Sequence, residues 1–131
     1  MAAENVQLMQ QLADLWNADD WDGVFAYYDD DVVFEDRLLP DGDTYRGIDA
    51  VRERFRELRE VAGAWKVETE TIMDAGADVV WINRVRGRPR EDIPPFEVRA
   101  GVVFSFDGAR VVRVQWFASP EAALEAAGLS A

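Results

Sequence analysis

The first half of the chain has the apolar spacing of amphipathic helices. Apolar residues recur every three or four positions in three segments, which predicts three helices that each bury one face. The residues are Val6, Met9, Leu12, Ala13 and Trp16 in the first segment, Trp21, Val24, Phe25 and Tyr28 in the second, and Ile48, Val51, Phe55 and Leu58 in the third. A short strand, VVFED, is predicted between the second and third helices.

The second half changes to the alternating period of β-strands. Val, Trp, Ile and Phe dominate four segments, at 65–73, 79–87, 96–106 and 110–117. The link DAGAD and the pair Asp107-Gly108 predict hairpins, whereas the longer RPREDIPP predicts a loop or lid. Ser119 and Pro120 are typical of a helix start, and a last helix is predicted to stop at Gly128.

This order of elements predicts an α+β fold in one domain, residues 1–131. Three N-terminal helices are expected to pack on one face of a curved, mainly antiparallel sheet and to leave a cone-shaped pocket. No internal repeat or linker interrupts the chain.

Composition narrows the chemistry, because the chain contains no Cys and no His. Disulfides, thiolate nucleophiles, His-based triads and Cys or His zinc sites are excluded, and no calcium-loop pattern occurs, so no metal or other cofactor is expected. A net charge of −12 argues against nucleic-acid and anionic-membrane partners. Without a secretory leader or a long apolar run, a cytoplasmic location is expected.

Two stretches, WNADDWDGVFAYYDDDVVFEDR and YRGIDAVRERF, together with the order of elements, resemble the NTF2-like superfamily, in its SnoaL-like and ketosteroid-isomerase-like branch. The resemblance places Asp36 where ketosteroid isomerases keep their general base. Their oxyanion donors correspond to Leu12 and Val102, which cannot donate. It also places Arg84 at the arginine of limonene-epoxide hydrolases, but Arg86 and Trp116 stand where that branch has its acids.

Strand alternation and the family register together predict the lining of a pocket. Phe34 and Asp36 share a face because they are two residues apart. The catalytic candidates are Asp36 and Arg84, expected to lie near each other without being locked in a pair. The substrate-binding candidates are Tyr28, Phe34, Phe55, Ile82, Arg86, Val102 and Trp116, with Trp16 and Trp65 at the rim.

Three functions remain open from the sequence. The leading hypothesis is a cofactor-independent enzyme of isomerase, hydrolase, dehydratase or cyclase type, which acts on a hydrophobic small molecule by carboxylate acid/base chemistry. The alternatives are a non-catalytic ligand-binding module and a dimeric partner protein. A homodimer through the outer sheet face is expected, because this face is predicted to mix aromatic and hydrogen-bonding side chains. These are Trp81, Asn83, Val103, Arg113, Gln115 and Phe117.

Overall fold

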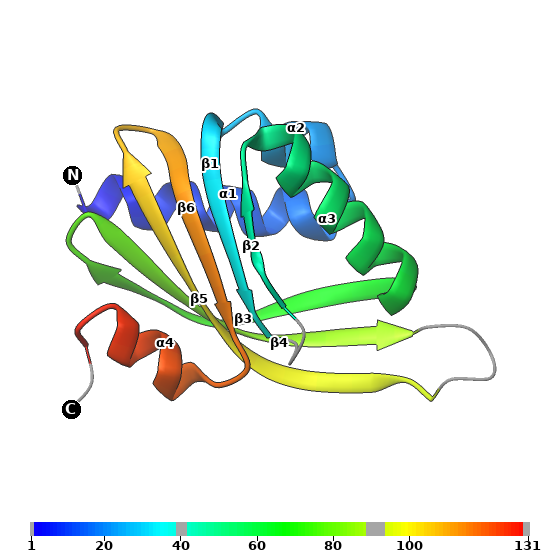
Figure 1. The fold of residues 1–131 in the computed structure, drawn as a ribbon. Helices are drawn as coiled ribbons and strands as arrows, with labels where there is room; N and C mark the ends of the chain where they lie inside the picture. Colours follow the sequence, from blue (N-terminus) through cyan, green and yellow to red (C-terminus); the bar gives the residue numbers. More distant parts are fainter. Residues whose placement is uncertain (1, 39–41, 89–93, 130–131) are drawn as a thin grey trace.

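A computed structural model describes residues 2–38, 42–88 and 94–129 and shows an α+β fold with a six-stranded curved sheet (Figure 1). The N-terminal elements are α1 (Ala2–Asn17), α2 (Trp21–Phe25), β1 (Tyr28–Arg37), β2 (Thr44–Arg46) and α3 (Ile48–Ala62). The C-terminal elements are β3 (Ala64–Ala75), β4 (Asp78–Arg88), β5 (Phe96–Asp107), β6 (Arg110–Phe117) and α4 (Pro120–Ala126). Residues 89–93 of the predicted lid lie outside the described part.

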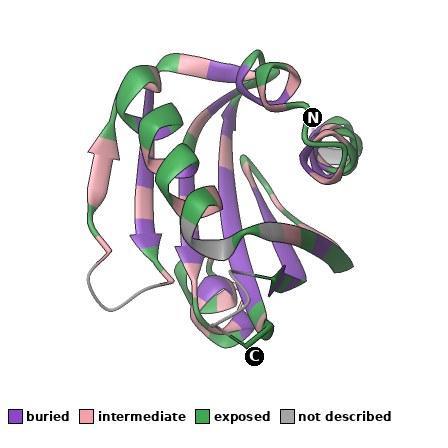
Figure 2. Cartoon of the chain, turned by 90° about the vertical axis from the view of Figure 1, so that its right-hand side faces the viewer, coloured by how far each residue is buried: buried purple, intermediate pink, exposed green. Residues whose placement is uncertain are grey.

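The strands follow the order β2-β1-β6-β5-β4-β3, and only β1 and β6 are parallel neighbours among the described strands. The sheet is therefore mainly antiparallel, as predicted. The inner face is the one covered by α1, against β3 and β4, and by α3, against β1 and β2. The outer face carries α4 against β5 and β6. In Figure 2, buried residues lie along the strands behind α3. The side of α3 that faces away from the sheet is exposed.

Helices on both faces give the sheet two apolar layers. Val79 and Trp81 belong to the main core under α1 and α3, whereas Val80 and Ile82 pack with Ala123 under α4. Successive residues of one strand point to opposite faces, so β4 must be apolar at four consecutive positions to serve both layers.

Three predictions about these elements are wrong. The second helix ends at Phe25, and Tyr28 instead opens β1, where it pairs with Val111. The three-residue strand β2 lies between VVFED and the third helix, where no second strand is predicted. The outward series of the sheet is also partly incorrect, because Trp81 and Asn83 are buried on the inner face. Val103 packs in the layer beneath α4, and Phe117 packs against it. The homodimer expected from that series stays a prediction.

The close packing of α4 against the outer face of the sheet depends on a glycine in β5. A Cβ atom at Gly101 would lie 2.5 Å from the Cβ of Ala123 and 3.1 Å from the Cα of Pro120. Because well-packed interiors have no room for an added methyl group, α4 can approach the outer face this closely only over a residue without a side chain.

We predict that Gly101→Ala lowers the free energy of unfolding by about 1–3 kcal/mol, the usual cost of overpacking. Urea titration followed by tryptophan fluorescence measures the change. The double variant Gly101→Ala/Ala123→Gly should recover part of the loss beyond additivity, because it removes the opposing methyl group. Strict additivity of the two substitutions would contradict the proposed contact.

Candidate functional site

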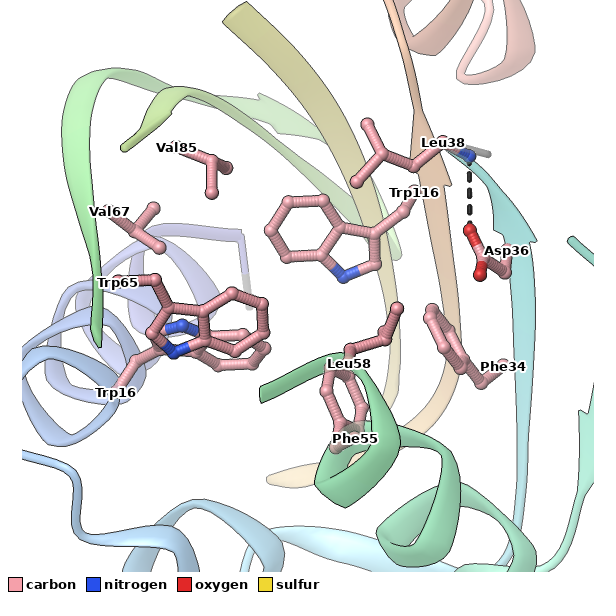
Figure 3. A pocket seen from close by; sticks show the side chains of 10 residues that line it. All are labelled: Trp16, Phe34, Asp36, Leu38, Phe55, Leu58, Trp65, Val67, Val85 and Trp116. Carbon is pink, nitrogen blue, oxygen red and sulfur yellow. Dashed lines mark hydrogen bonds between the residues drawn. The ribbon is translucent and has the colours of Figure 1, made fainter. Parts of the chain in front are cut away.

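A small cavity lies between the inner face of the sheet and α3, with a volume of about 40 Å³. Its lining is aromatic and aliphatic apart from one carboxylate, and it comes from α1, α3 and four strands (Figure 3). The lining residues are Trp16, Phe34, Asp36, Leu38, Phe55, Leu58, Trp65, Val67, Val85 and Trp116. The predicted residues that do meet here are Asp36, Phe34, Phe55 and Trp116, with Trp16 and Trp65.

Asp36 faces the cavity because of the alternation along β1. Phe34 and Asp36 are buried on the inner face, while Glu35 points outward to Arg113. The Asp36 side chain is 1% exposed, and both of its oxygens are engaged. Oδ1 accepts a hydrogen bond from the backbone N–H of Leu38 at 3.1 Å, and Oδ2 accepts one from Nη2 of Arg54 at 2.8 Å. Asp36 thus both closes the turn after β1 and anchors an ion pair.

Arg54, the partner of Asp36, is a functional candidate that sequence reasoning missed. Its side chain is 15% exposed, and its guanidinium carbon lies 5.4 Å from the centre of the Tyr45 ring. Burial disfavours the charged guanidinium, but the hydrogen bond to Asp36 and nearby negative charge outweigh burial and raise the pKa of Arg54. The available signal was helical spacing, because Arg54 is three residues after Val51 and four before Leu58.

The predicted positions of Arg84 and Arg86 are wrong, because β4 is turned by one residue relative to the expected register. Trp81 and Val85 occupy the inner face, so both arginines point outward. Arg84 contacts Glu70 at 2.8 Å and Glu97 at 3.0 Å, and these hydrogen bonds raise its pKa. Arg84 is therefore neither in the cavity nor beside Asp36.

Arg86 contacts Glu68 at 3.4 Å and Glu97 at 3.7 Å on the same exposed network. Ile82, another predicted lining residue, belongs to the layer under α4. Tyr28 and Val102 are buried in the main core but do not border the cavity. Burial raises the pKa of the Tyr28 hydroxyl, and this hydroxyl has no hydrogen-bond partner among the described residues.

Tryptophan side chains make up one end of the cavity. The ring centre of Trp16 lies 5.7 Å from that of Trp65 and 5.8 Å from that of Trp116. Asn17 holds this arrangement, because its side-chain amide donates to the carbonyl oxygen of Val67 at 2.7 Å and accepts from the N–H of Val67 at 2.9 Å. The end of α1 is thereby fixed against β3, next to Trp65.

Asn83 was predicted on the outer face of the sheet, and this prediction is wrong. It lies on the inner face between Trp81 and Val85, with Thr69 and Ala100 opposite it on the neighbouring strands. The residue is 0% exposed, and within the described part of the chain neither its amide nitrogen nor its oxygen has a partner. Buried polar groups normally have hydrogen-bond partners, so the unpaired Asn83 amide lowers the free energy of unfolding.

Two other features were sought among the described residues, a metal site and a membrane-spanning helix. No group of three or more acidic side chains among them is arranged to hold a metal ion. No helix in the described ranges is long and apolar enough to cross a membrane.

We predict that Arg54→Leu destabilises the protein, because it leaves the buried Asp36 carboxylate without its cation. Removal of one partner of a buried pair costs about 3–5 kcal/mol, and the low end applies because Arg54 keeps some solvent contact. Arg52→Leu is the matched control on the same helix: Arg52 pairs with Asp22, which is 91% exposed, so the expected loss is below about 1 kcal/mol. Chemical denaturation compares the two, and equal losses would contradict the assigned role of Arg54.

Two asparagine substitutions should change stability in opposite directions. Asn83→Leu is expected to stabilise the protein by about 1–3 kcal/mol, because it removes an unpaired buried amide. Asn17→Leu, the matched change, should destabilise it, because Asn17 makes two hydrogen bonds to Val67. Thermal unfolding measures both, and a loss of stability in Asn83→Leu would show that the amide is paired in solution.

Comparison with known proteins identifies the family. The model of the SnoaL-like domain family matches residues 9–114. No functionally curated protein matches the chain. The solved structures that resemble it include Bal32a from a soil-derived mobile gene cassette, with a TM-score of 0.78, 17% identity and 88% coverage of each chain. An NTF2-like protein from Burkholderia thailandensis E264 has a TM-score of 0.76, 24% identity and coverage of 86% of this chain and 88% of its own.

TerC, in a structure with polyporic acid, has a TM-score of 0.76 and 13% identity, over 95% of this chain and 98% of its own. At these identities the structures establish the fold, whereas the family match spans most of the sequence. The chain belongs to the SnoaL-like domain family.

Proposed function

We propose that this protein binds a hydrophobic small molecule in the cavity between α3 and the inner face of the sheet. The observation that carries the proposal is the composition of the wall: nine apolar side chains surround one carboxylate that is already neutralised by Arg54. Apolar walls with few fixed polar groups are typical of small-molecule sites. The structure of TerC with polyporic acid supports the proposal, because it shows a protein of the same fold with an organic ligand.

The ligand must enlarge the cavity as it binds. Drug-sized molecules occupy sites of roughly 300–1,000 Å³, and the cavity measures about 40 Å³. Most of the wall is fully buried, but Leu38, Leu58 and Trp65 are only half-buried. These three side chains can move into solvent without a change in the sheet, and we assign the entrance to them.

Acid/base catalysis by Asp36 is a second candidate function, because its carboxylate borders the cavity. Two observations make binding the better supported of the two. Both Asp36 oxygens already accept hydrogen bonds, and Leu12 and Val102, which correspond to the oxyanion donors of ketosteroid isomerases, are buried and apolar. Arg84, the other catalytic candidate, lies on the other face of the sheet.

Thermal shift against a panel of terpenoid, steroid and polyketide-like compounds tests the proposal. A ligand at about 100 times its Kd adds about 2.7 kcal/mol of stability, which raises Tm by several degrees. We predict such a rise for the wild type, for Asp36→Asn and for Arg84→Ala, the control on the outer face. Failure of every compound to stabilise the wild type would contradict binding.

Incubation of each bound compound with protein, followed by mass spectrometry, distinguishes the two functions. Turnover by the wild type that is lost in Asp36→Asn, while the thermal shift persists, would identify Asp36 as the catalytic acid or base. Unchanged compounds in all samples would identify a non-catalytic binding protein.

A further inference from the structure

The contacts of α3 with the rest of the fold indicate which part of the cavity wall moves when the cavity enlarges. We propose that Arg59, through its contacts with Asp19 and Trp21, holds the C-terminal half of α3, residues 55–62, closed over the cavity and thereby controls entry. The inference rests on the proposed binding function and specifies how access to that site is controlled.

The two halves of α3 are anchored differently. In the N-terminal half, Nη2 of Arg54 lies 2.8 Å from Oδ2 of Asp36, which is buried. In the C-terminal half, Nη2 of Arg59 lies 3.7 Å from Oδ1 of Asp19, and the two side chains are 40% and 57% exposed. Among the described side chains, no other ion pair joins residues 55–62 to another element. Longer and solvated ion pairs are weaker, so the Arg59 contact opens more readily than the Arg54 contact.

The half of α3 that Arg59 holds contributes directly to the cavity wall. Phe55 and Leu58 both line the cavity, and Figure 3 shows them extending from α3 into the lining. Leu58, one of the entrance residues, directly precedes Arg59 in the sequence. Movement of residues 55–62 away from the sheet would therefore widen the cavity and leave the ion pair of Arg54 intact.

Trp21 connects Arg59 to the other side of the entrance. The guanidinium carbon of Arg59 lies 4.6 Å from the centre of the Trp21 ring, a cation–π contact. The Trp21 ring centre in turn lies 4.7 Å from that of Trp16 and 6.1 Å from that of Trp65, another entrance residue. One arginine thus joins the α3 side of the entrance, at Leu58, to the tryptophan side.

Asp19 has an unusual backbone conformation. Its φ is 57°, and it is the one non-glycine residue in the described part of the chain with a positive φ. Such conformations are uncommon outside glycine and tend to occur at functional sites. The Asp19 N–H donates to the carbonyl oxygen of Trp16 at 3.1 Å, and Asn17 fixes this end of α1 against β3. The carboxylate that receives Arg59 therefore belongs to an anchored turn, and α3 is the element that moves.

The absence of cysteine from the chain allows a direct test by thiol labelling. Val85→Cys places a single thiol in the cavity wall, and Val103→Cys places one in the apolar layer beneath α4; both valines are buried. Methyl methanethiosulfonate, a small neutral reagent, modifies a buried thiol only while its surroundings are open. The labelling rate, followed by mass spectrometry, therefore measures opening on each face of the sheet.

We predict that Arg59→Leu raises the labelling rate of the Val85→Cys protein by about threefold to tenfold. This is the factor expected from loss of one exposed ion pair and one cation–π contact. The rate of the Val103→Cys protein should not change, because the layer beneath α4 does not depend on α3. If Val85→Cys fails to fold, Val67→Cys offers a second buried position in the same wall.

Arg52→Leu is the matched control. Arg52 also contacts an acid and an aromatic ring, Asp22 at 2.8 Å and Phe25 at 5.0 Å from the ring centre, but it lies in the N-terminal half of α3. Its substitution should leave the labelling rate in the cavity unchanged.

Asp19→Asn tests the ion pair separately from the cation–π contact. Asparagine tolerates a positive φ as aspartate does, so the substitution removes the charge without forcing the turn to change. It should raise the labelling rate in the cavity by less than Arg59→Leu does. It should have no further effect in the Arg59→Leu background, because its partner is then absent.

Equal increases at the two thiols would show that Arg59 stabilises the whole fold, and would overturn the proposal. An unchanged labelling rate in the cavity of Arg59→Leu would overturn it as well. Neither result depends on a ligand, so the thermal-shift panel still decides the binding function separately.

Discussion

The buried ion pair between Asp36 and Arg54 is the interaction on which the site depends. It joins the end of β1 to the middle of α3, and so fixes how far the helix stands from the sheet at the cavity. Asp36 could not remain charged in this position without a partner, since an isolated buried carboxylate is very unfavourable. The same pair neutralises the one acid of the cavity wall and leaves the remaining surface apolar.

Three tryptophan side chains line the cavity at the end away from the ion pair between Asp36 and Arg54. Asn17 fixes the end of α1 against β3, and the ring of Trp16 is stacked on that of Trp65 and tilted against that of Trp116. This packing buries a large apolar area, and the three indole nitrogens have no hydrogen-bond partner among the described residues.

Much of the fold could be predicted from the sequence, because long periodic segments bury one face. The four C-terminal strands and the inward position of Asp36 followed from alternation, and the hairpin at Asp107-Gly108 followed from its turn residues. Alternation could not decide the faces of β4, since Val79, Val80, Trp81 and Ile82 are all apolar. Helices cover both sides of that strand, and the resulting one-residue ambiguity misplaced Arg84.

The ion pair between Asp36 and Arg54 could not be predicted from the sequence for a different reason. Arg54 is one of eight charged residues in α3, and helical spacing indicates only that it borders the apolar stripe. Whether such an arginine is solvated or turned inward depends on what lies across from it in the fold. The unpaired state of the indole nitrogens is likewise a property of packing, because sequence shows the donors but not the acceptors around them.

A crystal of the wild-type protein soaked with a brominated aromatic compound tests the central claim most directly, because anomalous scattering locates the bromine. The account predicts that the aromatic ring lies between the inner face of the sheet and α3, in contact with Phe34, Leu58 and Trp116. A ligand found only on the protein surface, with the cavity closed and Leu58 and Trp65 unmoved, would contradict it.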